Sequence, residues 1–209
     1  MNDGRSIKVI GVSGVARAGK DTFVSILINR LKERGKSSAK IALADPLKEY
    51  CDSFCRANLG VTAFTQIPAE KLLIRPMLVW FGDAKRKQTN GRFWVDLASK
   101  SIDKLDGNVD YAIISDVRYD HYERDEVDWL KLEQKGVLIH VSRYTSVGDV
   151  KEYVPPANDH ELLNDPKVKN KSDYRVEWPT IPNVDLDNLD THPSMIKYVD
   201  NFLDSQKIN

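Results

Sequence analysis

The sequence predicts an α/β fold with three layers: a mainly parallel five-stranded sheet with helices on both faces. Short apolar runs alternate with longer segments whose apolar residues recur at helical spacing, which is typical of chains that build parallel sheets. The length of 209 residues suits one domain with an insertion. A glycine-containing loop, Gly14 to Lys20, joins the first apolar run to the first amphipathic segment. We therefore expect residues 1–209 to form a single domain.

The first half of the chain begins with a predicted strand over residues 7–12. The segment after the loop is predicted to be helical, with Gly35 placed to end it. Its apolar stripe follows the i, i+3, i+4, i+7 pattern: Val24, Leu27, Ile28 and Leu31. A second strand is predicted over 40–44. Asp45 can cap the next helix, over 47–57, and Pro46 can occupy its first turn.

The remaining elements follow the same alternation. Apolar runs predict strands over residues 111–115, 137–142 and 174–178. Helices are predicted over 68–81, 93–105 and 123–135, the last of these stopped by Gly136. A final amphipathic helix carries Met195, Val199 and Phe202.

Residues 144–172 interrupt this rhythm. The segment is polar and contains Pro155-Pro156 and four lysines, Lys151, Lys167, Lys169 and Lys171. It is either a solvated surface insertion or a mobile lid over a site. We describe it as a lid-like insertion and leave both alternatives open.

The composition excludes several function classes. Lys plus Arg equals Asp plus Glu at 31 each, so we expect no stable partnership with nucleic acid. No run of 18 apolar residues and no apolar signal core occur, so we expect no membrane partner. Cys51 and Cys55 are expected to be buried, reduced thiols. The expected location is the cytoplasm, or the host cytoplasm if a phage encodes the chain.

The loop has the spacing G-x4-G-K between a predicted strand and a predicted helix, which is the context of a phosphate-binding loop. Glycines let backbone N–H groups turn toward phosphate oxygens, and the helix N-terminus adds positive potential. Lys20 is placed to reach the β- and γ-phosphates of ATP. The predicted cofactor-binding residues are Gly14, Val15, Ala16, Ala18, Gly19, Lys20, Asp21 and Thr22.

Asp21 stands where most phosphate-binding loops have a Ser or Thr hydroxyl for Mg²⁺, and Thr22 comes one position late. GTPases need a D-x-x-G switch, and no Asp here has Gly three residues on; the N-K-S-D at 170–173 follows no apolar strand. Motor-type ATPases favour a strand that ends in Asp-Glu, whereas here the strand ends in Asp116-Val-Arg118. The small kinases are the class that remains.

Arginine placement supports a kinase, because phosphoryl transfer depends on positioning and charge neutralisation. Arg17 lies within the loop. Arg118 and Arg143 follow predicted strands, at the sheet edge where open α/β sheets bind ligands. Arg75 and Arg86 lie on a further segment. Together they are predicted to clamp phosphates.

Several segments, in order, resemble the phage-type deoxynucleoside monophosphate kinases, over about residues 7–165. The loop G-K-D-T and the strand followed by Asp-Val-Arg are the most specific. Animal-type phosphomevalonate kinase looks like a relative, since it shares a G-K-D loop, a P-L-K element and a strand followed by Asp-x-Arg, and it is the rival resemblance. The matching segments are GVARAGKDT (14–22), ALADPLKEY (42–50), RPMLVWFGDAKR (75–86), FWVDLA (93–98), IISDVRY (113–119) and GVLIHVSR (136–143).

The resemblance implies a P-loop kinase fold with an acceptor-binding region over about 45–98. The acceptor-side residues that it implies are Asp45, Lys48, Arg75, Gly82, Asp83, Arg86, Trp94, Asp116 and Arg118. The sequence departs from the family at Val79 and at Gly82-Asp83, where the family often has Gln and Gly-Thr. The family's His-Glu-Ser-Glu appears only as Asp-His-Glu-Leu at 159–162.

The expected mechanism uses Lys20, Arg17, Asp21, Arg118 and Arg143 as catalytic residues. Lys20 and Arg17 hold the phosphates of ATP, with Mg²⁺ bridging the β and γ groups. The expected metal residues are Asp21, acting through water or by orienting Lys20 and an arginine, Thr22, if the loop register shifts, and Asp116, through water or by orienting Arg118. Arg143 approaches the transferring group on lid closure. A phosphate acceptor is already anionic and needs no general base.

The favoured function is ATP-dependent phosphorylation of a (deoxy)nucleoside 5′-monophosphate to the diphosphate, for nucleotide precursor supply. Two alternatives stay open: a kinase of another phosphorylated small molecule, such as phosphomevalonate, and a nucleotide-binding protein without turnover. The expected partners are ATP and the nucleoside monophosphate, with a homodimer possible.

Overall fold

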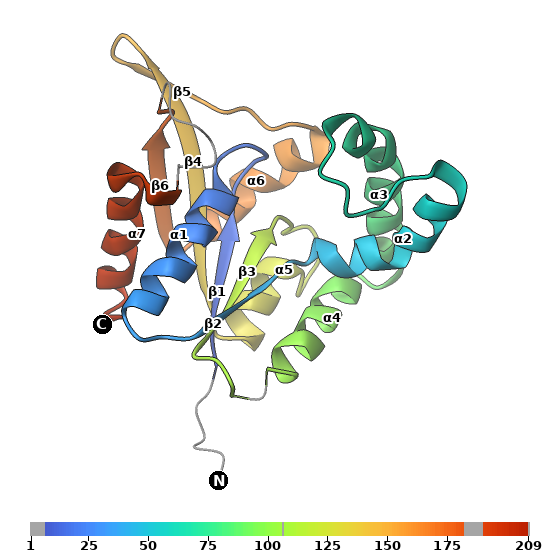
Figure 1. Ribbon diagram of the computed structural model, residues 1–209, viewed down its shortest axis with the longest axis horizontal. Helices are drawn as coiled ribbons and strands as arrows, with labels where there is room; N and C mark the ends of the chain where they lie inside the picture. Colours follow the sequence, from blue (N-terminus) through green and yellow to red (C-terminus); the bar gives the residue numbers. More distant parts are fainter. Residues whose placement is uncertain (1–6, 106, 182–189, 209) are drawn as a thin grey trace.

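A computed structural model describes residues 7–105, 107–181 and 190–208 of the chain (Figure 1). They form an α/β fold with a mostly parallel sheet flanked by helices. The sheet has six strands rather than the predicted five. The strands are β1 (Lys8–Ser13), β2 (Ser38–Ile41), β3 (Tyr111–Val117), β4 (Val137–Val147), β5 (Val150–Tyr153) and β6 (Tyr174–Pro179).

Strand β1 lies in the middle of the sheet and pairs in parallel with both β3 and β4. Ile10 is the register partner of Ile113 on one side and of Val137 on the other. β2 extends the sheet beyond β3, and β6 extends it beyond β4, both in parallel. The carboxyl ends of these parallel strands therefore meet at one edge, where open α/β sheets bind ligands.

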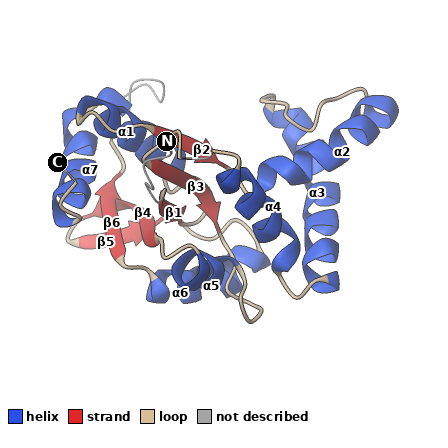
Figure 2. Cartoon of the chain, turned by 90° about the horizontal axis from the view of Figure 1, so that it is seen from below, coloured by secondary structure: helices blue, strands red, loops and turns tan. Residues whose placement is uncertain are grey.

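Helices cover both faces of the sheet, while α2 and α3 project to one side (Figures 1 and 2). α1 and α7 pack on one face, and α4, α5 and α6 on the other. The helices are α1 (Lys20–Glu33), α2 (Ala44–Leu59), α3 (Pro68–Gln88), α4 (Arg92–Asp103), α5 (Glu126–Asp128), α6 (Asp159–Lys171) and α7 (Pro193–Ser205), with a π-helical turn η1 (Trp129–Glu133) after α5.

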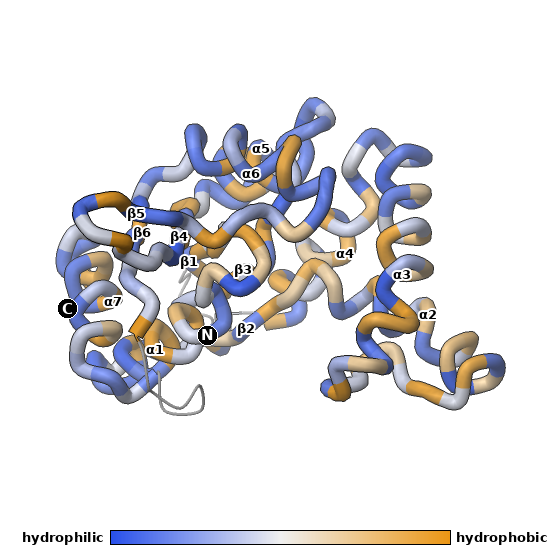
Figure 3. The backbone as a smooth tube through the Cα atoms, turned by 90° about the horizontal axis from the view of Figure 1, so that it is seen from above, coloured by the Kyte–Doolittle hydropathy of each residue, from blue (hydrophilic) through white to orange (hydrophobic). Residues whose placement is uncertain are grey.

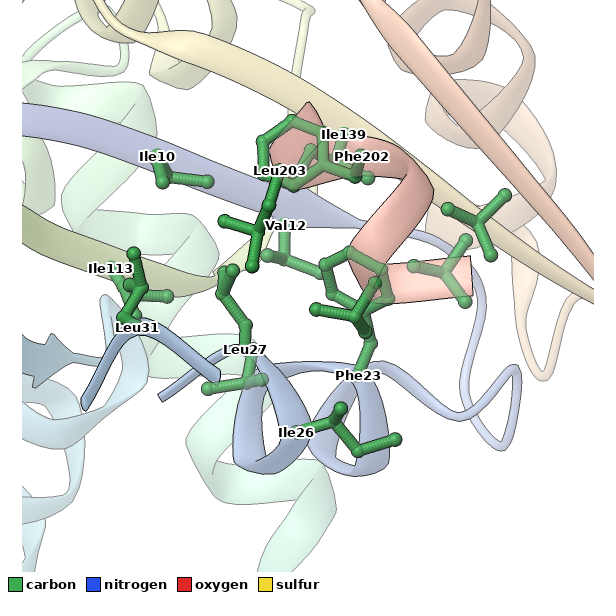
Figure 4. Packing of buried hydrophobic residues seen from close by; sticks show 14 of the residues in the cluster. Ile10, Val12, Phe23, Ile26, Leu27, Leu31, Ile113, Ile139, Phe202 and Leu203 are labelled. Atoms are coloured by element: carbon green, nitrogen blue, oxygen red, sulfur yellow. The ribbon is translucent and has the colours of Figure 1, made fainter. Parts of the chain in front are cut away.

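The core on the α1 side fixes the helix that follows the loop. Phe23 and Leu27 of α1 are fully buried against strand β1 and helix α7 (Figure 4). The Phe23 ring lies 6.1 Å from the Trp178 ring and 6.2 Å from the Phe202 ring, centroid to centroid. Such tilted aromatic contacts add to the free energy of burial. The start of α1, and with it the loop, is thereby held against the sheet.

Two further clusters complete the interior. One fills the opposite face of the sheet and centres on Trp129, Leu130 and Leu138, all fully buried. The other is small and lies between α2 and α3, around Cys55 and Ile74. Figure 3 shows hydrophobic and hydrophilic positions alternating along these two helices. Cys51 and Cys55 are buried and free, as the sequence predicts, and burial raises the pKa of both thiols.

The additional strand arises within the predicted insertion. β4 continues through Val147 and turns back into β5, with Tyr144 paired to Tyr153 in antiparallel register. The turn is Gly148-Asp149, and Gly148 has φ +60°. A glycine at the first central position of a two-residue turn is a known hairpin signal, because that position needs a positive φ.

Two predicted helices differ clearly in their bounds, and a further helix, α6, was not predicted. α3 continues to Gln88, beyond the predicted end at 81. The helix predicted over 123–135 begins only at Glu126, because Arg124 has φ +60° and the Asp125 side chain caps the helix by accepting the Glu126 N–H. The insertion contains α6, whose cap is Asn158. Among the described residues, no helix is long and apolar enough to span a membrane.

Candidate active site

The loop between β1 and α1 follows a path that requires its two glycines. Gly14 has φ +136°, and a Cβ there would lie 2.2 Å from the Val141 carbonyl oxygen. Gly19 has φ +90°, and a Cβ there would lie 2.5 Å from the Trp178 ring. Arg17, with φ +66°, adopts a left-handed conformation that non-glycine residues rarely take outside functional loops. The loop is thus pressed against β4 and β6.

Trp178 packs against the loop, a contact that the sequence does not reveal. Its side chain is fully buried, and its Nε1 donates a hydrogen bond to the Ala18 carbonyl at 2.8 Å. The sequence predicts a strand at this position but carries no signal that the tryptophan contacts a loop 160 residues away. Long-range contacts of this kind become visible only in three dimensions.

Lys20 is buried beneath the loop. Its Nζ donates to the carbonyl oxygens of Gly14 and Val15, each at 2.7 Å. An ammonium group has three N–H donors, so one remains for a bound anion. Burial, with a smaller contribution from the positive charge of Arg118, lowers the pKa of Lys20 from 10.5 to about 8. The charge of this lysine is therefore sensitive to pH near neutrality.

A cavity of about 560 Å³ opens on one side of the loop. Lys20, Thr22 and the exposed side chain of Arg17 line it, together with Arg143 from β4. Among the described residues, Arg143 Nε is the buried side-chain nitrogen that has no hydrogen-bond partner. An unpaired buried donor is costly unless a ligand satisfies it. The apolar wall of this cavity includes Trp178, Pro179, Ile181 and Met195.

A second cavity, of about 240 Å³, lies on the other side, between the sheet edge and α2–α3. Its wall is mainly apolar and is formed by Leu43, Leu47, Leu78, Val79 and Trp94. Cationic side chains border it: Lys48, Arg75 and Arg118. The two cavities share no lining residue: loop residues line the first, and none of residues 14–20 lines the second.

Asp116, at the end of β3, secures the start of α2. Its two carboxylate oxygens accept the N–H groups of Leu43 at 2.7 Å and Ala44 at 3.0 Å. Burial raises its pKa, and the positive charge of nearby Arg118 acts in the opposite direction. These contacts tie the start of α2 to the sheet edge. They use two of about four lone-pair positions and leave the others toward the second cavity, which Asp116 lines.

Arg86 also lines the second cavity, but its guanidinium is committed to a buried ion-pair network. It pairs with Asp125 at 2.7 Å and with Glu126, and it lies 3.6 Å over the Tyr119 ring. Glu126 in turn accepts the backbone N–H groups of Arg118 and Tyr119. Arg86 therefore fixes the backbone that presents Arg118.

The other sequence-predicted acceptor residues surround the same cavity with varied roles. Asp45 pairs with Lys48 at 3.0 Å, and the exposed Lys87 pairs with Asp83. Trp94 is buried and donates from Nε1 to the Gly82 carbonyl at 3.1 Å, so it supports the wall. The residues of this group that line the cavity are Lys48, Gly82, Asp83 and Trp94. Asp45 and Lys87 do not line it.

The carboxylate of Glu161, from α6 in the insertion, was not predicted to belong to the site. It accepts the N–H of Ala16 in the loop and pairs with Arg118 at 3.1 Å. The N-x-x-E pattern from Asn158 to Glu161 is a helix-start signal that marks α6, although it does not reveal the contact with the loop.

Of the three residues predicted for Mg²⁺, Asp21 and Thr22 line the first cavity, whereas Asp116 lines the second. The side chain of Asp21 is 91% exposed, 3.6 Å from Lys40, at the first turn of α1. In the described part of the chain, no group of three or more His, Cys, Asp or Glu side chains forms a metal cage. Mg²⁺ is commonly bound through one or two carboxylates plus substrate phosphates, so Asp21 suits this mode.

Comparison with known proteins adds little. No family model matches the sequence, and no curated protein matches it. Among solved structures, the chain is similar to an unliganded sugar kinase from Janibacter sp., with 13% identity and a TM-score of 0.41, over 97% of this chain and 95% of that one. Similarity at this level assigns neither a family nor a substrate.

Replacing Arg86 with Ala should lower the free energy of unfolding by about 3–5 kcal/mol, because two buried carboxylates lose their counter-charge. Burial raises the pKa of Glu126, and the positive charge of Arg86 acts in the opposite direction. Lys87→Ala is the matched control, since Lys87 is exposed on the same helix. Urea unfolding of both variants measures the difference. Equal stabilities would contradict the network described for Arg86.

If the loop binds ATP, as the sequence predicts, the lowered pKa of Lys20 predicts weaker binding as pH rises. Below about pH 8 the ammonium is charged and attracts the triphosphate; above it, binding must first protonate the amine. Affinity should fall from pH 7.5 to 9.5, by up to about tenfold per unit above the pKa, with proton uptake on binding. Calorimetry in two buffers measures both quantities. In Lys20→Ala the decline should be absent; an identical decline would exclude Lys20 as its source.

Proposed function

We propose that the protein transfers the γ-phosphoryl group of ATP to a (deoxy)nucleoside 5′-monophosphate. The observation that carries this proposal is a pair of separate cavities, each bordered by its own cations, of which one is lined by the glycine loop. Lys20 and Arg143 line one cavity, and Arg75 and Arg118 line the other. A kinase for a phosphorylated acceptor must hold two polyanions, each beside its own cations, and bring them together at the loop.

The cations around the second cavity favour a phosphate as the acceptor group. Transfer to a hydroxyl would call for a general base, and the carboxylates that line this cavity are all engaged. Asp116 accepts two backbone N–H groups, Asp83 pairs with Lys87, and Glu126 pairs with Arg86. A phosphate monoester is already anionic at neutral pH and needs no base. Arg75 and Arg118 are both exposed at the cavity and suit a phosphate by charge.

The apolar wall of the same cavity favours a nucleoside over a small polar metabolite. Leu47, Leu78 and Trp94 form a surface against which a flat base could be buried, and the volume of about 240 Å³ suits a compact ligand. An acceptor such as phosphomevalonate would bring polar groups and no aromatic ring to this wall. The base preferred and the choice between ribose and deoxyribose are outcomes of the experiment below.

In the proposed reaction, an oxygen of the acceptor phosphate forms a bond to the γ-phosphorus. The bond between that phosphorus and the β–γ bridging oxygen breaks, and ADP leaves with this oxygen. Lys20 and Arg17 neutralise the phosphates of ATP, and Arg118 holds the acceptor phosphate. The unpaired Nε of Arg143 donates a hydrogen bond to a phosphate of ATP. Mg²⁺, held with Asp21, would supply further neutralisation of the β- and γ-phosphates.

An ADP-release assay tests the function. Deoxynucleoside monophosphates, nucleoside monophosphates and phosphomevalonate are each supplied with ATP and Mg²⁺. Turnover with one or more nucleoside monophosphates supports the proposal. Turnover with phosphomevalonate alone would replace the acceptor. Tight ATP binding without transfer to any acceptor would favour a nucleotide-binding protein without turnover.

Arg118→Ala should raise the acceptor KM by about tenfold or more while ATP affinity stays close to normal. A hydrogen bond to a charged group contributes about 1.5–3 kcal/mol, and a tenfold change corresponds to about 1.4 kcal/mol. Arg175→Ala, at an exposed arginine of β6, is the control for loss of positive charge. If ATP affinity collapses and the acceptor KM is unchanged, the two sides of the loop are assigned the wrong way round.

A further inference from the structure

The carboxylate of Glu161 lies in a setting built to hold an anion. The side chain is 8% exposed although it carries a charge. Its two oxygens lie 3.1 and 3.2 Å from the backbone nitrogen of Ala16. The N–H of Ala157 donates to it at 2.9 Å, and Arg118 Nη1 donates at 3.1 Å. Buried charges are rare unless paired in this way.

Helix capping explains only part of this arrangement. The Asn158 side chain accepts the Glu161 N–H at 3.0 Å, which is half of a capping box. In such a box, the glutamate turns back to the N–H of the capping residue. Here it reaches the preceding residue, Ala157, and extends to a loop 145 positions away in sequence. Glu161 therefore links α6 to the loop as well as capping the helix.

The donor set is one that binds phosphate oxygens. A backbone N–H from a phosphate-binding loop, a second backbone N–H and an arginine are arranged around one anionic group. Glu161 also borders a small cavity of about 70 Å³. That cavity shares Arg75, Val79, Arg118 and Tyr119 with the larger acceptor cavity. The carboxylate thus stands between the acceptor cavity and the loop.

We propose that Glu161 occupies the subsite of the acceptor's phosphate, and that this phosphate must displace the carboxylate from Ala16 and Arg118. The proposal rests on the proposed function and adds that the Glu161 carboxylate competes with the acceptor's phosphate for the same hydrogen-bond donors. Two anions at one set of donors repel each other, so binding of either excludes the other. The acceptor affinity is thereby reduced until Glu161 has moved.

The displacement involves the first turn of α6 and leaves the rest of the helix in place. Further along α6, Asp165 lies 3.0 Å from His140 Nε2, and Lys171 pairs with Asp120 at 2.8 Å. Val168 is buried in the core on that face. These contacts hold the carboxyl-terminal half of α6 on the sheet. Glu161, near the N-terminus of the helix, is free of them and can swing away with its own turn.

The test measures binding of inorganic phosphate without ATP or turnover. Phosphate is titrated into ¹⁵N-labelled protein, and the amide resonances of Ala16 and Ala157 are followed in wild type and in Glu161→Gln. The glutamine keeps the shape of the side chain and removes its charge. We expect the phosphate Kd at these two amides to fall by at least fivefold. An unchanged or higher Kd overturns the proposal, because it would mean that Glu161 positions Arg118 for the anion.

Two controls separate competition from helix capping. Asn158→Ala weakens the same cap and leaves the carboxylate, so its phosphate Kd should match that of wild type; a gain equal to that of Glu161→Gln overturns the proposal. In Glu161→Gln/Arg118→Ala the gain should disappear. Failure of this proposal is distinct from failure of the function. If Glu161→Gln binds phosphate more tightly but the protein transfers no phosphoryl group to nucleoside monophosphates, only the proposed function is rejected. If transfer occurs but Glu161→Gln does not bind phosphate more tightly, only the proposed subsite is rejected.

Discussion

The parallel pairing of β1 with both β3 and β4 is the constraint on which the rest of the molecule depends. It brings the loop after β1 between the residues that follow β3 and those at the end of β4, so that arginines distant in sequence face one loop. The loop can approach its neighbours only because Gly14 and Gly19 lack side chains. The two cavities on either side are consequences of this one placement.

Buried carboxylates fix the backbone around the basic residues of the site, and the chain as a whole has no excess of basic residues. The chain has as many acidic as basic side chains, 31 each. Glu126 holds the backbone at Arg118, Asp116 holds the start of α2, and Glu161 lies against the loop itself. Each of these acidic groups accepts backbone N–H groups, and Glu126 and Glu161 also pair with Arg86 and Arg118. Cationic side chains are thus gathered at the cavities in a protein of zero formal net charge.

The sequence was informative where local chemistry determines structure. The strand, loop and helix around Gly14–Lys20 follow from glycine spacing and apolar periodicity, and the alternation of elements predicts the parallel sheet. It was uninformative where a contact joins distant segments, as for Trp178 beneath the loop or Glu161 against Ala16. Arg86 was expected at the substrate, yet nothing local indicates that Asp125 and Glu126 hold it. The β5 hairpin was missed although Gly148-Asp149 is a usable turn signal.

The small cluster around Cys55 and Ile74 has a consequence for dynamics. It is separate from the two cores that hold the sheet, and it contains few fully buried side chains. A unit with so little buried apolar surface opens at a lower free energy than the whole domain, so α2 and α3 should exchange their amide hydrogens sooner than the strands do. A ligand in contact with both Leu47 and Leu78 would hold α2 and α3 together. Occupancy of the cavity would then stabilise the wall beside it.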